Sequence, residues 1–281
     1  MTRPALLLII SVFLLWSCTE KIDVKLDSTY ARLVVDGHIE SDSGTYIVAL
    51  TETSDYFANV PSPKVVNAAV TISDGNQTYP LTETAKGISG LYATPVGFRA
   101  EHGKTYTLNV DLQDEIAGVK TAAASCYLPP VTHLDSIAAT FHQDWGKEGA
   151  WTIKLWAQEP GDEVNYYLFN YYRNGKLISD TITKKVVSDD KFYNGSYMTG
   201  VDVIYINNMH EWETLHTGDT VTLQMSGITK EYFDFVNQVS QAGFSIPFFS
   251  GPPANVQGNV SNGGVGFFAA WSNSYATCIV K

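Results

Sequence analysis

The sequence predicts a mainly β protein: an N-terminal immunoglobulin-like β-sandwich, followed by a second β-rich, sandwich-like domain that contains one α-helix. Period-two alternation of apolar and polar residues recurs in short segments from Leu33 onward, which is typical of strands with one buried face. Asp74-Gly75 and Asn174-Gly175 stand between such segments, as the turns of β-hairpins do. Helical periodicity is convincing in one segment, from about residue 230 to 242.

The first 17 residues have the composition of a signal peptide. After Arg3, an apolar run of 12 residues extends from Ala5 to Trp16. A helix that spans a bilayer needs about 20 apolar residues, so this run is too short to span. Leu15-Trp16-Ser17-Cys18 resembles a bacterial lipobox, and polar sequence follows at once. We therefore expect removal of residues 1–17 and acylation of Cys18; an ordinary secretory signal with an incidental Cys18 is the alternative.

The composition of the mature chain is that of a globular protein with an acidic balance. Removal of residues 1–17 takes away one positive charge, Arg3, so the formal charge moves from −11 to −12. Nucleic acid is not expected as a partner, because phosphate binding depends on clustered Lys and Arg. With 44% hydrophobic and 17% charged residues, the chain is able to bury the cores of one large or two modest domains.

A polar, lipidated tether is expected over residues 18–31 and an immunoglobulin-like sandwich of about seven strands over residues 31–128. Its clearest strand, 105–112, alternates Tyr, Leu, Val and Leu on one face with Thr, Thr, Asn and Asp on the other. Gly103-Lys104-Thr105-Tyr106 resembles the tyrosine corner of such domains, in which the Tyr hydroxyl bonds to nearby backbone.

Pro129-Pro130 favours an extended linker, and a second β-rich domain is expected over residues 129–281. Residues 151–156 and 220–226 alternate like half-buried strands, and a long, tyrosine-rich hairpin is expected around Asn174-Gly175. The helix over 230–242 has Thr229 as its N-cap and Gly243 as its stop. Its apolar stripe is formed by Tyr232, Phe235, Val236 and Val239.

The order of these landmarks resembles domain-of-unknown-function family 4249, whose members are cell-envelope lipoproteins typical of the Bacteroidota. The blocks that carry the resemblance span nearly the whole mature chain: Glu20–Asp23, Leu33–Ile39, Tyr46–Thr51, Ala69–Gly75, Gly90–Tyr92, Gly103–Tyr106, Tyr166-Tyr167, Gly258–Val260 and Gly266–Ala270. The resemblance implies a lipoprotein anchored in outer-membrane lipid, at the cell surface, which works beside a TonB-dependent transporter in nutrient acquisition. It brings no catalytic motif, no cofactor and no agreed ligand.

Cys126 and Cys278 remain once Cys18 is assigned to the lipid. In an oxidising compartment a disulfide between them would clamp the C-terminal tail onto the interdomain region. Two buried free thiols are the alternative, and the sequence does not decide between them.

No enzymatic motif is present, and no catalytic or metal-binding residue is assigned. His210-Glu211-Trp212-Glu213 with His216 would offer a metal three ligands if the segment curled, but a polar hairpin loop is the favoured interpretation. Asp189-Asp190, with Asp202, suggests a glycosidase pair or a calcium site. The favoured interpretation is again plain: adjacent aspartates point to opposite faces of a strand and usually lie in a solvated turn.

Aromatic residues in or beside expected loops are the candidates for an interaction surface: Trp145, Trp212, Tyr193, Tyr197, Phe248 and Phe249. Flat rings of this kind stack on sugars or contact a partner protein. The alternative for each ring is that it folds back and caps the end of a sandwich. Phe248-Phe249, after Pro247, is the best single candidate for an interaction tip.

Three hypotheses for function follow. The first is a non-enzymatic lipoprotein, facing the cell surface or the periplasm, that binds or relays a nutrient ligand, such as a glycan or a peptide, or docks on a transporter. The second is a hydrolase of surface polysaccharide or peptide that uses an unrecognised carboxylate pair, and the third is an adhesin or envelope scaffold.

Overall fold

The computed structural model describes residues 31–54, 60–161, 163–208, 213–242 and 256–281. The expected signal peptide, the acylated Cys18 and the tether lie outside the described residues. Trp212, Phe248 and Phe249, three of the aromatic candidates, also lie outside them. Within the described part of the chain, no helix is both long and apolar enough to cross a membrane.

Seven strands are described between residues 33 and 127, in agreement with the number expected. They are β1 (Leu33–Glu40), β2 (Ile47–Glu52), β3 (Ala69–Ser73), β4 (Thr78–Glu83), β5 (Leu91–Ala93), β6 (Thr105–Ile116) and β7 (Val119–Tyr127). Ser73 pairs with Thr78 across the turn at Asp74-Gly75, which confirms that hairpin. The Tyr106 hydroxyl accepts a 2.7 Å hydrogen bond from the Glu101 backbone N–H, as a tyrosine corner requires.

The second half of the chain contributes the remaining elements. They are β8 (Leu134–His142), β9 (Ala150–Gln158), β10 (Tyr166–Arg173), β11 (Lys176–Leu177), the 3-10 helix η1 (Ile182–Lys184), β12 (Val186–Asp189), β13 (Tyr197–Asn207), β14 (Thr220–Ile228), α2 (Lys230–Ala242) and β15 (Val265–Ile279). The prediction of a mainly β fold with a helix over 230–242 is therefore confirmed. The Tyr232 backbone N–H donates to Thr229 Oγ1 at 3.3 Å, so Thr229 caps the helix as expected.

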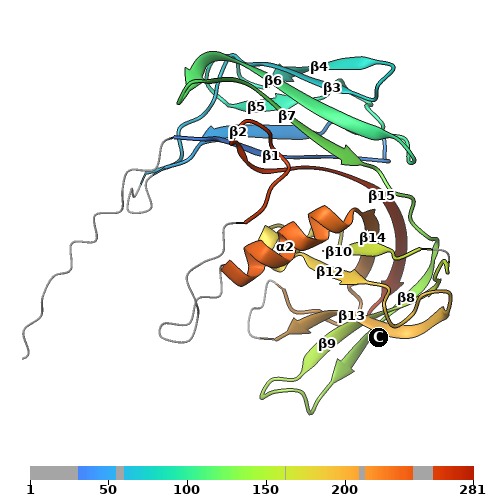
Figure 1. Ribbon diagram of the computed structural model, residues 1–281. Coiled ribbons are helices and arrows are strands. Elements are labelled where there is room, and N and C mark those ends of the chain that lie inside the picture. The colour runs from blue at the N-terminus through green and yellow to red at the C-terminus, as the bar shows by residue number, and fades with distance from the viewer. Residues whose placement is uncertain (1–30, 55–59, 162, 209–212, 243–255) are drawn as a thin grey trace, which may run out of the picture. The chain divides into compact units, whose positions relative to one another are not determined.

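Two sheets organise these strands (Figure 1). The larger one has the order β11-β10-β14-β15-β1-β2-β5-β4-β3-β6-β7, and β12 pairs with the same edge of β10 as β11 does. The smaller one has the order β13-β9-β8. Arg173 pairs with Lys176 around Asn174-Gly175, and both turn residues have positive φ, which confirms the second hairpin. This hairpin is short, because the chain leaves β10 after β11 and returns to it as β12.

Strand β15 changes partners halfway along its length (Figure 1). Its first part, Val265–Trp271, runs parallel to β1, and its second part, Ser272–Ile279, runs antiparallel to β14. Side chains alternate across a strand, so Phe268 and Ala270 enter the core of the first seven strands, while Phe267 and Trp271 pack beside Tyr232 of α2. One sheet therefore joins both halves of the chain, and the division into two domains at residue 129 stays a prediction.

The two cysteines that the structure describes are free thiols. Cys126 is buried in the core formed by β1 to β7, whereas Cys278 packs against the separate core between β9, β10 and β14. The structure therefore has free thiols in different hydrophobic cores, and of the two only Cys126 is buried, because Cys278 is partly exposed.

Candidate functional site

A pocket of about 300 Å³ lies where the edge of the larger sheet faces the smaller sheet. Its walls come from β10, β12, β13, the end of β9 and the turn after β12. The lining residues are Glu159, Tyr167, Phe169, Val186, Val187, Ser188, Asp189, Asp190, Tyr193, Met198, Val201, Asp202 and Val203. A volume of this size is at the lower end of the range for small-molecule sites.

Glu159 enters the pocket because it continues the alternation of β9. Leu155 and Ala157 are buried, Gln158 is exposed, and the next inward position falls on Glu159, which is 1% exposed. The Glu159 backbone N–H donates to the Ser196 carbonyl at 3.0 Å, so the pairing of β9 with β13 extends to this residue. The backbone thus holds a carboxyl group in a position that a core residue would ordinarily occupy.

The two carboxyl oxygens of Glu159 have different surroundings. Oε1 accepts a 2.7 Å hydrogen bond from the Tyr167 hydroxyl, whereas Oε2 is buried and has no hydrogen-bond partner. Burial and, to a smaller extent, the nearby charge of Asp190 raise the pKa of Glu159 to about 7, against the opposing effect of the Tyr167 hydrogen bond. Burial, the hydrogen bond to Glu159 and the nearby carboxylates likewise raise the pKa of Tyr167. Glu159 therefore titrates near neutral pH.

Asp190 is fixed by backbone hydrogen bonds around it. Its Oδ2 accepts from the Asn165 backbone N–H at 3.0 Å, and its carbonyl accepts from Tyr193 and Asn194 at 2.7 and 2.8 Å. The side chain is 3% exposed, and Oδ1 has no hydrogen-bond partner. Asp190 therefore precedes a turn, as expected, but the expectation of a solvated side chain is wrong, because the carboxyl group is buried and bonded to the Asn165 backbone.

The charges of the described lining are all acidic: Glu159, Asp189, Asp190 and Asp202. Lys154 of β9 forms an ion pair with Asp202, at 3.9 Å between Nζ and Oδ1. Among the described residues, no group of three or more His, Cys, Asp or Glu side chains could hold a metal ion. The pocket therefore combines acidic groups and apolar side chains, and its described residues do not form a metal-binding cluster.

The scan against protein families matches residues 19–276 to the model described as "Domain of unknown function (DUF4249)". The chain belongs to this family. The match covers most of the chain and agrees with the family that the sequence blocks indicate. No curated protein matches the sequence.

In this DUF4249 chain, the structure brings together Asp189, Asp190 and Asp202, the three carboxylates noted in the sequence, and adds Tyr193. Tyr193 is 37% exposed at the pocket. Sequence reasoning missed Glu159, although a signal existed: the residue follows the apolar alternation of β9 at an inward position. The sequence Gln158-Glu159-Pro160-Gly161 instead suggests a turn.

The other two described aromatic candidates lie outside the pocket lining. The Tyr197 side chain is 49% exposed, and its hydroxyl donates to Asp135 Oδ2 at 2.9 Å. Trp145 stacks on His142, with ring centroids 3.9 Å apart. Both rings thus make local contacts on the surface of the smaller sheet.

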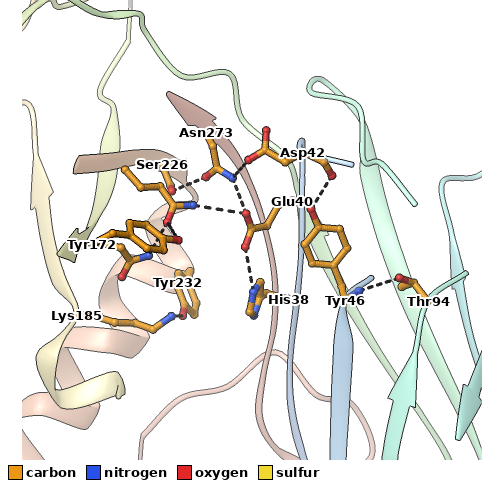
Figure 2. Close-up of polar contacts among 12 residues, drawn as sticks. His38, Glu40, Asp42, Tyr46, Thr94, Tyr172, Lys185, Ser226, Tyr232 and Asn273 are labelled. Atoms are coloured by element: carbon orange, nitrogen blue, oxygen red, sulfur yellow. Dashed lines mark hydrogen bonds and ion pairs between the residues drawn. The ribbon is translucent and has the colours of Figure 1, made fainter. Parts of the chain in front are cut away.

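A second polar cluster of the DUF4249 chain lies where β15 changes partners (Figure 2). Asn273 Nδ2 donates to Glu40 Oε2 at 2.5 Å and to Asp42 Oδ2 at 2.9 Å, and Figure 2 shows Asn273 reaching both carboxylates. The Tyr275 hydroxyl also donates to Asp42 Oδ2, at 2.6 Å. Because these carboxylates have partners within the fold, we interpret the cluster as a junction that fastens β1 to β14 and β15. Among the described residues, the buried carboxyl oxygens without a hydrogen-bond partner are Glu159 Oε2 and Asp190 Oδ1, and both residues line the pocket.

Proposed function

We propose that this protein is a non-enzymatic, lipid-anchored envelope protein that binds a small polar solute in the pocket between β10, β12 and β13. The observation that carries the proposal is that Glu159 and Asp190 both line the pocket, and that each has a buried carboxyl oxygen, Oε2 and Oδ1, without a hydrogen-bond partner. An unsatisfied buried polar group costs about 1–3 kcal/mol, and more when charged. A bound solute that donates hydrogen bonds would remove this cost. The unsatisfied oxygens therefore support ligand binding in the pocket.

The cellular setting of the proposal comes from the sequence. The lipobox at Leu15–Cys18 supports an anchor in outer-membrane lipid, and the family resemblance supports a cell-surface protein that hands its solute to a TonB-dependent transporter. A short tether over residues 18–31 would keep the binding protein within reach of such a transporter.

Two experiments test this function. The first measures thermal stabilisation of the full mature chain in detergent by pools of sugars, peptides, amino acids and amines, with Asp190→Asn as the pocket variant and Glu115→Gln, an exposed carboxylate of β6, as its control. We expect stabilisation of the wild type and of Glu115→Gln, and its loss in Asp190→Asn. Equal stabilisation of all three proteins would contradict binding at this pocket.

The second experiment is an affinity pull-down from native membranes, combined with proteolysis of intact cells. We expect recovery of an outer-membrane transporter and cleavage by external protease. Recovery of no transporter would count against the accessory role, and protection from protease would place the protein on the periplasmic side.

A second candidate function is hydrolysis, and one observation favours it. Glu159, with its pKa raised to about 7, shares the pocket with Asp189 and Asp202, and a carboxylic acid with a raised pKa beside a second carboxyl group is a feature of glycosidases. Screening of soluble glycans and peptides for turnover decides between the two. Turnover that Glu159→Gln or Asp202→Asn abolishes, and that Glu115→Gln leaves intact, would establish the enzyme in place of the binding protein.

A further inference from the structure

We propose that the pocket is selective for a small organic cation, a primary amine or diamine, whose ammonium group lies between Asp190 Oδ1 and Glu159 Oε2. This inference rests on the proposed binding function and names its ligand class. It is carried by the position, burial and chemistry of these two unpaired oxygens.

The charge of the described lining favours a cation over a neutral solute. The four ionisable carboxyl groups have no basic side chain among the described residues that line the pocket with them. An ionised carboxylate is an acceptor without a proton to donate, and an ammonium group offers three donors together with a full positive charge. A sugar hydroxyl offers one donor and no charge, so it would complement an acidic lining less well than an ammonium group does.

The walls of the pocket suit the carbon chain of an amine. Phe169 and Met198 are buried, and Val186, Val201 and Val203 complete an apolar lining beside the carboxyl groups. Tyr193 lies at the pocket with its ring half-exposed, where it would cover methylene groups or face a second ammonium group. A volume of about 300 Å³ fits a chain of a few carbons.

An inorganic cation fits the pocket less well. Calcium takes six to eight oxygen ligands, and magnesium requires near-octahedral geometry. The described carboxyl groups of the pocket do not form a cluster of three or more that could hold a metal ion. An ammonium group needs no such cluster, and the unpaired oxygens of Glu159 and Asp190 offer it two acceptors.

Proton release should accompany binding. Glu159 is faced by Tyr167 of β10, by Asp189 and Asp190 at the end of β12 and by Asp202 of β13, while Lys154 is paired with Asp202. Its pKa of about 7 leaves a large protonated fraction at neutral pH, and a cation at Oε2 would favour the ionised form. The affinity for an amine should therefore rise as the pH rises through about 7.

The test is titration calorimetry of the full mature chain in detergent with putrescine, and with 1,4-butanediol as its neutral match. We expect binding of putrescine, no heat from butanediol, and an observed heat that changes with the ionisation enthalpy of the buffer because a proton is released. Asp190→Asn should weaken putrescine binding about tenfold or more. Glu159→Gln should abolish the buffer dependence, and Glu115→Gln should change neither.

Asp202→Asn is a second pocket variant, in case the variants of buried residues fail to fold. It changes a half-exposed side chain and should weaken binding severalfold. Binding of neutral diols or sugars in preference to amines would overturn the cation inference and leave the binding function standing. Binding of calcium at the same site, abolished by Asp190→Asn, would also overturn it. Absence of binding by any solute pool would remove both the inference and the proposed function.

Discussion

The hydroxyl of Tyr167 donates a 2.7 Å hydrogen bond to Glu159 Oε1, inside a pocket where Glu159 Oε2 is left without a partner. One oxygen of this buried carboxyl group is thus satisfied by the fold, and the other is buried without a hydrogen-bond partner. This asymmetry is the reason for assigning the pocket to a ligand, since the carboxylates Glu40 and Asp42 at the β15 junction have partners within the fold.

The buried carboxyl of Glu159 predicts a specific pH dependence of stability. The folded protein retains the Glu159 proton up to about pH 7, whereas an unfolded glutamate releases it near pH 4.5. Its contribution to the free energy of unfolding therefore falls as the pH rises from about 4.5 to 7 and is level above that window. Glu159→Gln, which cannot ionise, removes this contribution.

Denaturant unfolding of both proteins at a series of pH values measures the difference. We expect the wild type to lose stability relative to Glu159→Gln across this window. A constant difference between the two proteins from pH 4.5 to 8 would show that Glu159 titrates normally.

The pKa of Glu83 is lowered, in contrast to that of Glu159. Burial would raise its pKa, but hydrogen bonds from the backbone N–H groups of Gly87, Gly90, Asn67 and Ser89 lower it to about 2. Stability from this carboxylate is present above pH 4.5 and is lost as the pH falls toward 2. Glu83→Gln should therefore destabilise the protein at pH 7 by about 1–3 kcal/mol, and less at pH 3.

Chemical denaturation at pH 7 and at pH 3 measures this effect, with the exposed Glu115→Gln as the matched control. Equal loss of stability in the two variants at pH 7 would contradict a special role for the Glu83 turn.

Gly266 permits the close approach of β15 to β1. Its φ is +91°, and a Cβ atom at this position would collide with the Val35 carbonyl oxygen. Gly263 has a φ of +77° but no atom within 4 Å of its Cβ position, so it is a matched control for backbone conformation alone. Gly263→Ala should cost about 1 kcal/mol, and Gly266→Ala several kcal/mol. Similar midpoints of thermal unfolding for the two variants would argue against the tight β1–β15 pairing.

The free thiols predict a labelling pattern. Cys126 is buried, and burial raises its pKa to about 11, so it should react with maleimide only when the protein unfolds. Cys278 is partly exposed and should label first in the folded protein. Mass spectrometry of tryptic peptides, without reductant, measures both sites. Failure of both cysteines to label in denaturant would reveal a disulfide that the structure lacks.

Local signals explain which parts of the fold were predictable. The turns at Asp74-Gly75 and Asn174-Gly175, the tyrosine corner and the helix capped by Thr229 each depend on a few neighbouring residues. Strand β15 was not recognised, because Phe267–Ser272 is buried on both faces and shows no alternation. Its parallel pairing with β1, more than 200 residues earlier, leaves no local signal.

The candidate site was predictable only in part, for a related reason. Asp189, Asp190 and Asp202 were noted in the sequence, but their burial depends on β10, β12 and β13 coming together. Glu159 stands next to a Pro-Gly pair that indicates a turn, and only the pairing of β9 with β13 places it inside. Tyr193 was a candidate because it is an aromatic residue in an expected loop. Tyr197 was a candidate for the same reason, but its hydroxyl is bonded to Asp135 and the residue lies outside the pocket lining.

The most direct measurement of the central claim is a ¹³C NMR titration of the Glu159 side-chain carboxyl, assigned with Glu159→Gln, with and without putrescine. The structure predicts a pKa of about 7 in the free protein, because the carboxyl is buried beside Asp190 and only half satisfied. Bound putrescine should lower this pKa, because an ammonium group favours the ionised form. A Glu159 pKa near 4.5 that putrescine leaves unchanged would contradict both the buried, half-satisfied carboxyl and its role in recognising a cation.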